Sequence, residues 1–328
     1  MALLEVKNLK VDYPLRGSWF AKRRFLHAVD DVSFTIERGE TVGLVGESGC
    51  GKSSIAKALV RLEEPAAGSI LINGTDISRL EGKALRKARK NFQMVFQDPY
   101  GSLNPRLSIQ STLDEVLLLH TNLDKAGRFK RMQELMKLVG LDPGQLARYP
   151  HEFSGGQRQR IGIARALATE PELLIADEPV SALDVSVQAS IINLLIDLQK
   201  TTGIGLLFIA HDLAVVEHIS NRILVMYLGR VVESAPAREL CSKPLHPYTA
   251  ALLSAVPALE NRSQERIKLA GDVPSPLAPP EGCAFHPRCA YASEKCRSCR
   301  PDLREISPGR FSACFRVQEN EVFSCEKP

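Results

Sequence analysis

The feature that most constrains this 328-residue chain is a glycine-rich segment that begins at Gly46. Residues 46–53 fit the pattern G-x-x-x-x-G-K-[ST] and lie between an apolar run of strand length, 41–45, and a helix-like stretch, 54–62. Glycines let successive backbone N–H groups turn inward toward anionic oxygens, and the following helix adds the positive end of its dipole. The segment therefore predicts a phosphate-binding loop. Its expected lining residues are Gly46, Glu47, Ser48, Gly49, Cys50, Gly51, Lys52, Ser53 and Ser54.

Short apolar runs recur along the chain, and most are followed by polar segments of helical character. Strands that alternate with helices favour an α/β fold with a largely parallel sheet, and uninterrupted apolar runs suit strands buried on both faces. Between about residues 98 and 165 the pattern becomes helical, as in 113–119 and 129–139, which predicts a helical insertion. The expected strands cover residues 41–45, 70–72, 92–96, 173–176, 206–210 and 223–227.

One of these runs, 173–176, leads directly into two carboxylates, Asp177 and Glu178. In enzymes with a phosphate-binding loop, an acid at such a strand end holds Mg²⁺, and the next acid can polarise the water that attacks the γ-phosphate. On its own, an Asp-Glu pair is more often a solvated strand end or a helix cap. Because the glycine-rich loop accompanies it, we expect Ser53 and Asp177 to bind Mg²⁺ and Glu178 to be catalytic.

The amino-acid composition argues against several classes of protein. Apolar residues make up 44% of the chain and charged residues 24%, and 42 Lys and Arg against 38 Asp and Glu leave a net charge of only +4. A general charge for nucleic-acid binding is therefore not indicated. No run approaches the roughly 18 apolar residues of a spanning helix, and the first residues do not resemble a signal peptide. We expect a cytosolic chain.

A second glycine motif carries a family resemblance. Residues 153–160, Phe-Ser-Gly-Gly-Gln-Arg-Gln-Arg, resemble the signature sequence of the nucleotide-binding subunits of ATP-binding cassette (ABC) transporters, and the likeness extends over nearly the whole chain. It implies a P-loop NTPase (RecA-like) core of ABC type, a helical signature subdomain at about 98–165, and ATP and Mg²⁺ as ligands. The signature residues that would contact ATP bound to a second subunit are Ser154, Gly155, Gly156 and Gln157.

Further residues match the family in the expected order. Gln97 matches the glutamine that can reach Mg²⁺ and the attacking water, and His211 matches the histidine that contacts the γ-phosphate. Tyr13 is the candidate for stacking on adenine, with Phe25 as its rival. The loop that crosses the dimer interface corresponds to Ser181, Ala182, Leu183 and Asp184.

The resemblance also implies a mechanism. Two cassettes close head to tail, so that each ATP lies between the phosphate-binding loop of one subunit and the signature of the other, and hydrolysis reopens the dimer. Closure and reopening drive a membrane partner. The family's key residues are present in this chain, so we expect it to contribute competent residues to the sites that it forms.

The nearer resemblance is to the ATPase subunits of bacterial dipeptide and oligopeptide importers, above all to the F-type subunit of the dipeptide importer. It rests on residues 97–105, 177–186, 246–257 and 274–289. Such importers pair two different ATPases beneath two permease subunits, and an extracytoplasmic peptide-binding protein delivers the cargo. The implied partners are these proteins, with a D-type chain as the second ATPase and no nucleic acid. The implied place is peripheral, on the cytoplasmic face of the bacterial inner membrane.

Two alternatives stay open. Related importers use the same type of ATPase for nickel chelates, glutathione or antimicrobial peptides. A soluble ABC ATPase of DNA repair or translation belongs to another class, but such proteins usually carry long coiled-coil insertions or two fused cassettes. The expected domains here are one nucleotide-binding domain over 1–260 and a Pro-rich and Cys-rich extension over 261–328.

Six of the eight cysteines fall between residues 283 and 325. Because structural disulfides are disfavoured in a cytosolic chain, thiolate ligation is the better class, and spacing alone does not decide between Zn²⁺ and an iron–sulfur cluster. The importer resemblance implies a [4Fe–4S] cluster on Cys283, Cys289, Cys296 and Cys314.

Four more residues belong to this region. Cys299 forms C-x₂-C with Cys296 and is a rival ligand, whereas Cys325 is expected to be a free thiol. His286 and Arg288 lie between the expected ligands, and we expect them to be supporting or surface groups.

Overall fold

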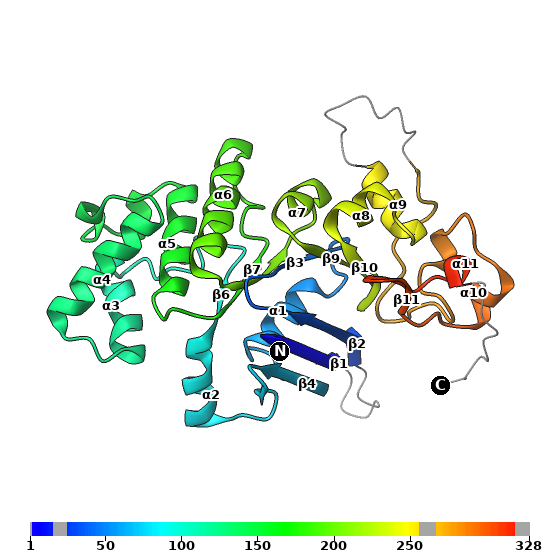
Figure 1. The fold of residues 1–328 in the computed structure, drawn as a ribbon, viewed down its shortest axis with the longest axis horizontal. Helices are drawn as coiled ribbons and strands as arrows, with labels where there is room; N and C mark the ends of the chain where they lie inside the picture. The colour runs from blue at the N-terminus through cyan, green and yellow to red at the C-terminus, as the bar shows by residue number, and fades with distance from the viewer. Residues whose placement is uncertain (1, 16–24, 256–266, 319–328) are drawn as a thin grey trace. The chain divides into compact units, whose positions relative to one another are not determined.

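The computed structural model describes residues 2–15, 25–255 and 267–318 (Figure 1). These residues fall into two compact units built from discontinuous segments. The first unit contains residues 2–5, 35–41 and 71–209, and the second contains the remaining described residues. The domain boundary expected at residue 260 lies outside the described ranges. Within those ranges, none of the helices has both the length and the apolar character needed to cross a membrane.

Three parallel strands form the centre of the first unit. Their order is β6 (Phe92–Val95), β7 (Leu173–Asp177) and β8 (Gly205–Ile209), and every residue of the last two strands is buried. Burial on both faces explains why these strands are uninterrupted apolar runs in the sequence. Parallel neighbours need long crossovers, and α6 (Val185–Thr202) provides the one between β7 and β8.

The expected helical insertion lies between β6 and β7. Helices α3 (Ile109–His120), α4 (Lys125–Leu138) and α5 (Gly155–Leu167) pack on one another (Figure 1). The first two begin at side-chain caps, because Ser108 Oγ accepts from the N–H of Ser111 at 3.1 Å and Asp124 Oδ1 accepts from that of Gly127 at 2.7 Å. The unit also contains α2 (Gly82–Ala88) and the short turns η1 (Arg89–Asn91), η2 (Pro143–Gln145) and η3 (Pro150–Glu152).

The second unit contains a mixed sheet in the order β11-β12-β10-β9-β3. Strand β3 (Thr41–Val45) is parallel to β9 (Arg222–Tyr227), but β9, β10 (Arg230–Pro236), β12 (Arg310–Ser312) and β11 (Arg304–Ser307) pair antiparallel. The expected strands 41–45 and 223–227 are thus parallel neighbours, as predicted, whereas the apolar runs do not predict the antiparallel strands β10, β12 and β11. The chain reverses at Leu228 and Gly229, whose positive φ angles of 42° and 81° are those of a tight hairpin turn.

Two long strands near the N-terminus are not found by a search for apolar runs. Strands β1 (Leu4–Pro14) and β2 (Phe25–Ile36) have buried residues interspersed with exposed ones, so polar residues interrupt their apolar pattern. They belong to a second sheet with β4 (Ala67–Ile72), to whose end the short β5 (Thr75–Asp76) adds. The helices and short turns of the second unit are α1 (Lys52–Leu59), α7 (Leu213–Ile219), α8 (Ala237–Ser242), α9 (Pro247–Ser254), η4 (His286–Arg288), α10 (Glu294–Ser298) and α11 (Phe315–Gln318).

The packing of α7 on β3 predicts a large effect from one methyl group. A Cβ on Gly43 would lie 2.1 Å from Val216 Cγ1 and 2.7 Å from Ser220 Oγ. We expect Gly43→Ala to lower the free energy of unfolding by about 1–3 kcal/mol, measured by urea denaturation of the full chain. The control is Gly162→Ala within α5, where a Cβ meets nothing within 4 Å; it should be neutral or stabilising by about 0.5–1 kcal/mol. Equal stabilities of the two variants would contradict the packing.

Candidate functional site

The loop between β3 and α1 lies against the backbone of two other strands. A Cβ on Gly46 would lie 2.2 Å from the carbonyl oxygen of Met226 in β9, and one on Gly51 would lie 2.1 Å from that of Ala28 in β2. Gly51 also has a φ of 105°, which side-chain-bearing residues rarely adopt. Glycine at these positions is thus required by close approach, and this approach fixes the curve of the loop.

The side chain of Lys52 folds back toward the first residues of the loop. Its side chain is buried, and its Nζ donates to the carbonyl oxygens of Gly46 at 2.8 Å and Glu47 at 3.0 Å. Cys50 is buried within the loop, and this burial raises the pKa of its thiol. A fixed ammonium group beside the first turn of α1 creates positive potential, so the loop can attract and hold an anionic oxygen group.

Two other expected residues lie beside this loop. The hydroxyl of Tyr13 in β1 donates to Ser54 Oγ, in the first turn of α1, at 3.3 Å. His211 directly follows Ala210, whose N–H donates to the carbonyl oxygen of Leu44 in β3 at 3.2 Å, so His211 lies at the end of the strand that leads into the loop. Phe25 begins β2 with 44% of its surface exposed. The adenine contact of either aromatic ring stays a prediction.

In the first unit, Gln97 and Glu178 meet at the carboxyl ends of β6 and β7. Gln97 Nε2 donates to Glu178 Oε2 at 3.1 Å. Asp177 is buried at the end of β7, and Glu178 has a φ of 45° while its N–H donates to the carbonyl oxygen of Ile209 at 2.9 Å. The chain thus turns sharply between the two acids, which leaves Asp177 buried and Glu178 partly exposed.

The signature residues open α5. Ser154 Oγ accepts from the N–H of Gln157 at 3.3 Å, and Gln157 Oε1 accepts from the N–H of Ser154 at 3.0 Å, which makes a capping box. A Cβ on Gly156 would lie 2.3 Å from Val187 Cγ1. Gly156 therefore allows the start of α5 to lie close to the start of α6, which follows the expected interface loop 181–184.

The structure describes the expected nucleotide residues as two groups, one in each unit. The loop, Tyr13 and His211 belong to the second unit, whereas Gln97, the two acids, the signature and loop 181–184 belong to the first. In the first unit, Ser181 Oγ donates to the carbonyl oxygen of Glu178 at 3.1 Å. This hydrogen bond connects the expected interface loop to the second acid.

A contact that the sequence does not reveal links the loop to the C-terminal extension. Arg288 Nη1 and Nη2 donate to Glu47 Oε2 at 2.8 Å and to Oε1 at 3.1 Å, and only 8% of the arginine side chain is exposed. The hydroxyl of Tyr248 accepts from the N–H of Glu47 at 2.9 Å. Arg288, expected to be a supporting or surface group, is thus buried and bound to the loop. The paired residues are 241 positions apart, and no local pattern signals such a pair.

An aromatic cluster lies beneath this contact. The ring of Phe285, from the extension, lies 5.4 Å from the rings of Tyr227 and Tyr248 and 5.6 Å from that of His246. All four residues are buried. Because aromatic rings in edge-to-face and tilted arrangements pack tightly, the cluster fixes the extension against β9 and α9.

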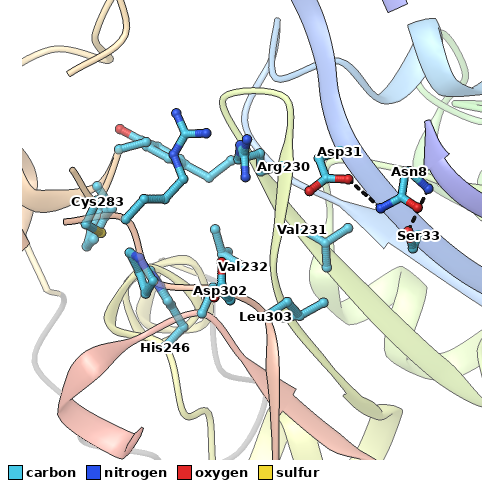
Figure 2. A pocket seen from close by; sticks show the side chains of 16 residues that line it. Asn8, Asp31, Ser33, Arg230, Val231, Val232, His246, Cys283, Asp302 and Leu303 are labelled. Carbon is cyan, nitrogen blue, oxygen red and sulfur yellow. Dashed lines mark hydrogen bonds between the residues drawn. The ribbon is translucent and has the colours of Figure 1, made fainter. Parts of the chain in front are cut away.

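Three members of the cluster, Tyr227, His246 and Phe285, also line a cavity of about 350 Å³. Figure 2 shows this cavity. Asn8 and Asp31, from β1 and β2, line one wall, where Asn8 Nδ2 donates to Asp31 Oδ1 at 2.8 Å. Cys283 and His246 lie across the cavity from them. The C-terminal extension therefore lines one side of the cavity, and strands β1 and β2 line the opposite side.

Four free thiols of the extension lie close enough to influence one another's ionisation. Burial raises the pKa of Cys283 to about 11, and the nearby thiols of Cys296, Cys314 and Cys289 contribute to this rise. Burial also raises the pKa of Cys289 and of Cys314. In the described part of the chain, however, no group of three or more His, Cys, Asp or Glu residues is arranged to hold a metal ion. The thiol chemistry fits iron or zinc, but the arrangement is not that of a formed site.

The rival ligand Cys299 has a different state. It is disulfide-bonded, so its thiol is not available and the expectation that it competes as a ligand is wrong. Cys325 lies outside the described residues.

Comparisons with known proteins match both parts of the chain. Residues 29–181 match the family model described as ABC transporter, and residues 232–296 match the one described as oligopeptide/dipeptide transporter, C-terminal region. The probable peptide ABC transporter ATP-binding protein y4tS of Sinorhizobium fredii is 53% identical over 95% of this chain and 89% of its own length. The oligopeptide transport ATP-binding protein AppF of Bacillus subtilis is 51% identical over 95% and 96%, and the dipeptide transport ATP-binding protein DppF of Haemophilus influenzae 50% over 96% and 97%.

Solved structures share the fold of the cassette. The dimeric post-hydrolysis state of the ATP-binding cassette MJ0796 bound to ADP and Pi has a TM-score of 0.64 and 29% identity, covering 72% of this chain and 99% of that one. The cbiO1 protein of Clostridium perfringens has a TM-score of 0.63 and 28% identity, covering 74% and 91%.

Burial of His246 predicts a pH dependence of stability. Its Nδ1 accepts from the N–H of Tyr248 at 3.1 Å as the cap of α9, and burial lowers the pKa of the imidazole from 6.5 to about 3. Below pH 6.5 the unfolded chain therefore binds a proton that the folded chain does not. We expect this group to lower the free energy of unfolding as the pH falls from 6.5 toward 3, by up to about 1.4 kcal/mol per pH unit.

The substitution His246→Asn keeps an acceptor at the cap without a titrating group. Urea denaturation at pH 7 and pH 5 should therefore show a smaller loss of stability in this variant than in the wild type. Exposed His218 gives the control, since His218→Asn should keep the wild-type loss. The same loss in His246→Asn as in the wild type would contradict the assignment.

Proposed function

Because the chain belongs to the ABC transporter family, among its peptide-transport ATP-binding proteins, we propose that it binds and hydrolyses ATP to power the import of dipeptides or oligopeptides. The observation that carries this proposal is the loop around Lys52, a curved cradle whose buried ammonium group and helix start suit the phosphates of a nucleotide. The match of residues 232–296 to the oligopeptide/dipeptide C-terminal region supports peptide as the cargo class.

Different residues bind the phosphates and the Mg²⁺ ion. Lys52 Nζ, now bonded to two loop carbonyl oxygens, can exchange them for β- and γ-phosphate oxygens within its reach. The hydroxyl of Ser53 and the carboxylate of Asp177 are hard oxygen donors, which is the chemistry that Mg²⁺ prefers. When bound, Mg²⁺ neutralises charge that develops on the phosphates.

We assign the polarisation of the attacking water to Glu178. Its carboxylate is partly exposed, and Gln97 Nε2 holds one of its oxygens at 3.1 Å. The glutamine can therefore orient both the carboxylate and the same water. His211 directly follows Ala210, whose N–H is bonded to Leu44 of β3, and we assign to it the contact with the γ-phosphate that the family resemblance implies.

ATP binding is proposed to close a head-to-tail dimer. Ser154, Gly155 and Gly156 open α5, so their backbone N–H groups suit the phosphates of ATP bound to the opposite subunit. The loop 181–184 would cross the interface. The dimeric structure of the cassette MJ0796 bound to ADP and Pi supports the formation of a dimer. The helical insertion is then the signature subdomain of a cassette over 1–260, followed by the extension over 261–328.

The remaining partners follow from the peptide-importer assignment. We propose that the opposite subunit is a D-type ATPase, that the pair lies beneath two permease subunits, and that an extracytoplasmic peptide-binding protein delivers the cargo. The chain would then be peripheral, on the cytoplasmic face of the inner membrane. The relatives named for oligopeptide and dipeptide transport support this assignment.

For the extension we propose that Cys283, Cys289, Cys296 and Cys314 hold a [4Fe–4S] cluster. The support is the presence of four free thiols that influence one another's ionisation and an N–H donor, from Tyr291, 3.4 Å from Cys289 Sγ. Such a cluster would cross-link three segments of the extension and stabilise its fold.

Removal of the proposed base should separate binding from turnover. We expect Glu178→Gln to keep the wild-type affinity for ATP and to lower phosphate release at least about 100-fold, because a positioned base contributes about 10²–10⁴ in rate. The variant should also accumulate as a closed dimer in size-exclusion chromatography with ATP. Lys52→Ala provides the contrast, since it should lose ATP binding itself. Wild-type phosphate release by Glu178→Gln would refute the base assignment.

The cluster proposal predicts the metal content of the protein. Anaerobically purified full chain should contain about four iron atoms per cluster and absorb visible light, as [4Fe–4S] proteins do. Cys283→Ser should lower the iron content, whereas Cys241→Ser, a change at a buried thiol in α8, should not. Colourless protein with stoichiometric zinc would overturn the iron assignment.

A further inference from the structure

Glu47 is the second residue of the phosphate-binding loop, and groups from three other residues hold its side chain and both of its peptide groups. Arg288 binds the carboxylate with two hydrogen bonds, at 2.8 and 3.1 Å. The hydroxyl of Tyr248 accepts from the N–H at 2.9 Å, and Lys52 Nζ donates to the carbonyl oxygen at 3.0 Å. The conformation of Glu47 is therefore coupled directly to the lysine that we assign to the phosphates.

The arginine itself is fixed by the packing of the extension. Arg288 ends the short turn η4, and its N–H donates to the carbonyl oxygen of Phe285 at 3.0 Å. Phe285 is 2% exposed and lies in the aromatic cluster with Tyr227 and Tyr248. The same segment is bonded to α10, since the N–H of Cys283 donates to the carbonyl oxygen of Cys296 at 2.8 Å. A guanidinium held this way presents its two N–H groups without having to become ordered first.

Tyr248, the second contact of Glu47, is also held from two sides. The Glu233 carboxylate in β10 accepts from the N–H groups of Leu245 and His246, both at 2.8 Å, and so fixes the turn before α9. His246 then caps that helix by accepting from the N–H of Tyr248. The motif 246–248 thus serves to place the Tyr248 hydroxyl against the loop.

The charge of Glu47 gives the arginine contact a further effect. A carboxylate in a loop that binds phosphates repels them, and the repulsion is large where water is partly excluded. The paired geometry with Arg288 neutralises that charge and keeps the carboxylate on the side of the loop that faces the extension. No other residue of the loop carries a negative charge.

We infer that Arg288 is a positioning residue for nucleotide binding: the C-terminal extension, through Arg288, holds Glu47 and neutralises it so that the loop takes MgATP. The inference rests on the proposed ATP binding and extends it to a residue outside the cassette motifs. It assigns to the extension a direct part in setting the affinity of the site.

The test is an equilibrium titration of the full chain with a fluorescent ATP analogue and Mg²⁺. We expect Arg288→Gln to raise the Kd about tenfold, the usual size of coupling between a site and a residue that acts on it indirectly. Phosphate release at saturating ATP in the assembled transporter should stay within about twofold of wild type, because the residue acts on binding and not on the water. Arg288→Lys keeps the charge but cannot make two parallel bonds, so its Kd should rise less.

Two further variants separate positioning from general destabilisation. Glu47→Gln combined with Arg288→Gln should bind the analogue more tightly than Arg288→Gln alone, because the carboxylate that needs compensation is gone. The control is Arg304→Gln in β11, where the arginine is 41% exposed and pairs with Asp302 at 3.6 Å. This control should bind the analogue as the wild type does.

The possible outcomes separate the proposed ATP binding from the proposed role of Arg288. A wild-type chain that does not bind the analogue would overturn the proposed ATP binding itself. Wild-type binding with equal Kd values for Arg288→Gln and Arg304→Gln, or a double variant that binds the analogue no more tightly than Arg288→Gln alone, would overturn the positioning role alone. If Arg288→Gln does not fold, as judged by circular dichroism, the comparison of Arg288→Lys with Arg304→Gln decides the point in the same way.

Discussion

The arrangement of the second unit depends on the absence of a side chain at Gly46 and Gly51. The carbonyl oxygens of Met226 and Ala28 occupy the space that a Cβ would need, so β9 and β2 lie directly against the loop. This contact sets where α1 begins and therefore where the ammonium group of Lys52 lies. Strands β2 and β9 and helix α1 therefore meet at this one tight loop, although they come from distant parts of the sequence.

Contacts from the extension and from α9 hold the same loop from the other side. Glycine fixes the loop by exclusion, since nothing larger fits, whereas Arg288 and Tyr248 fix it by attraction to Glu47. Exclusion sets the shape of the loop, and attraction selects one position of its acidic side chain. The structure thus describes the cassette loop and the extension as parts of one packed unit, although the family models for the two regions are separate.

The sequence predicts the local parts of this structure well. The strands over residues 41–45 and 173–176 are found at or within one residue of the expected limits, because an apolar run is a signal carried by neighbouring residues. Strands β1 and β2 escape the same reasoning, since interspersed polar residues interrupt their apolar pattern. The antiparallel turn at Leu228 and Gly229 also escapes it, because the apolar run before it gives no direction to the next strand.

The features of the candidate site differ in the same way: some depend on neighbouring residues and others on contacts between distant segments. Lys52, Glu178, Gln97 and the signature belong to short motifs, so the sequence alone predicts them as site residues. The pairing of Arg288 with Glu47 and the disulfide state of Cys299 depend on which distant segments pack together. Local composition places cysteines and an arginine in one region, but three-dimensional packing decides which of them is bonded and to what.

The pairing of β12 with β10 has a consequence for how this chain can be shortened. Strand β12 comes from the extension, and it covers the edge of β10 with Ser312 opposite Glu233. A chain that ended before β11 and β12 would expose that edge, and an unpaired edge strand is a template for the addition of strands from other molecules. A shortened chain that keeps the edge of β10 paired must therefore include β12, residues 310–312.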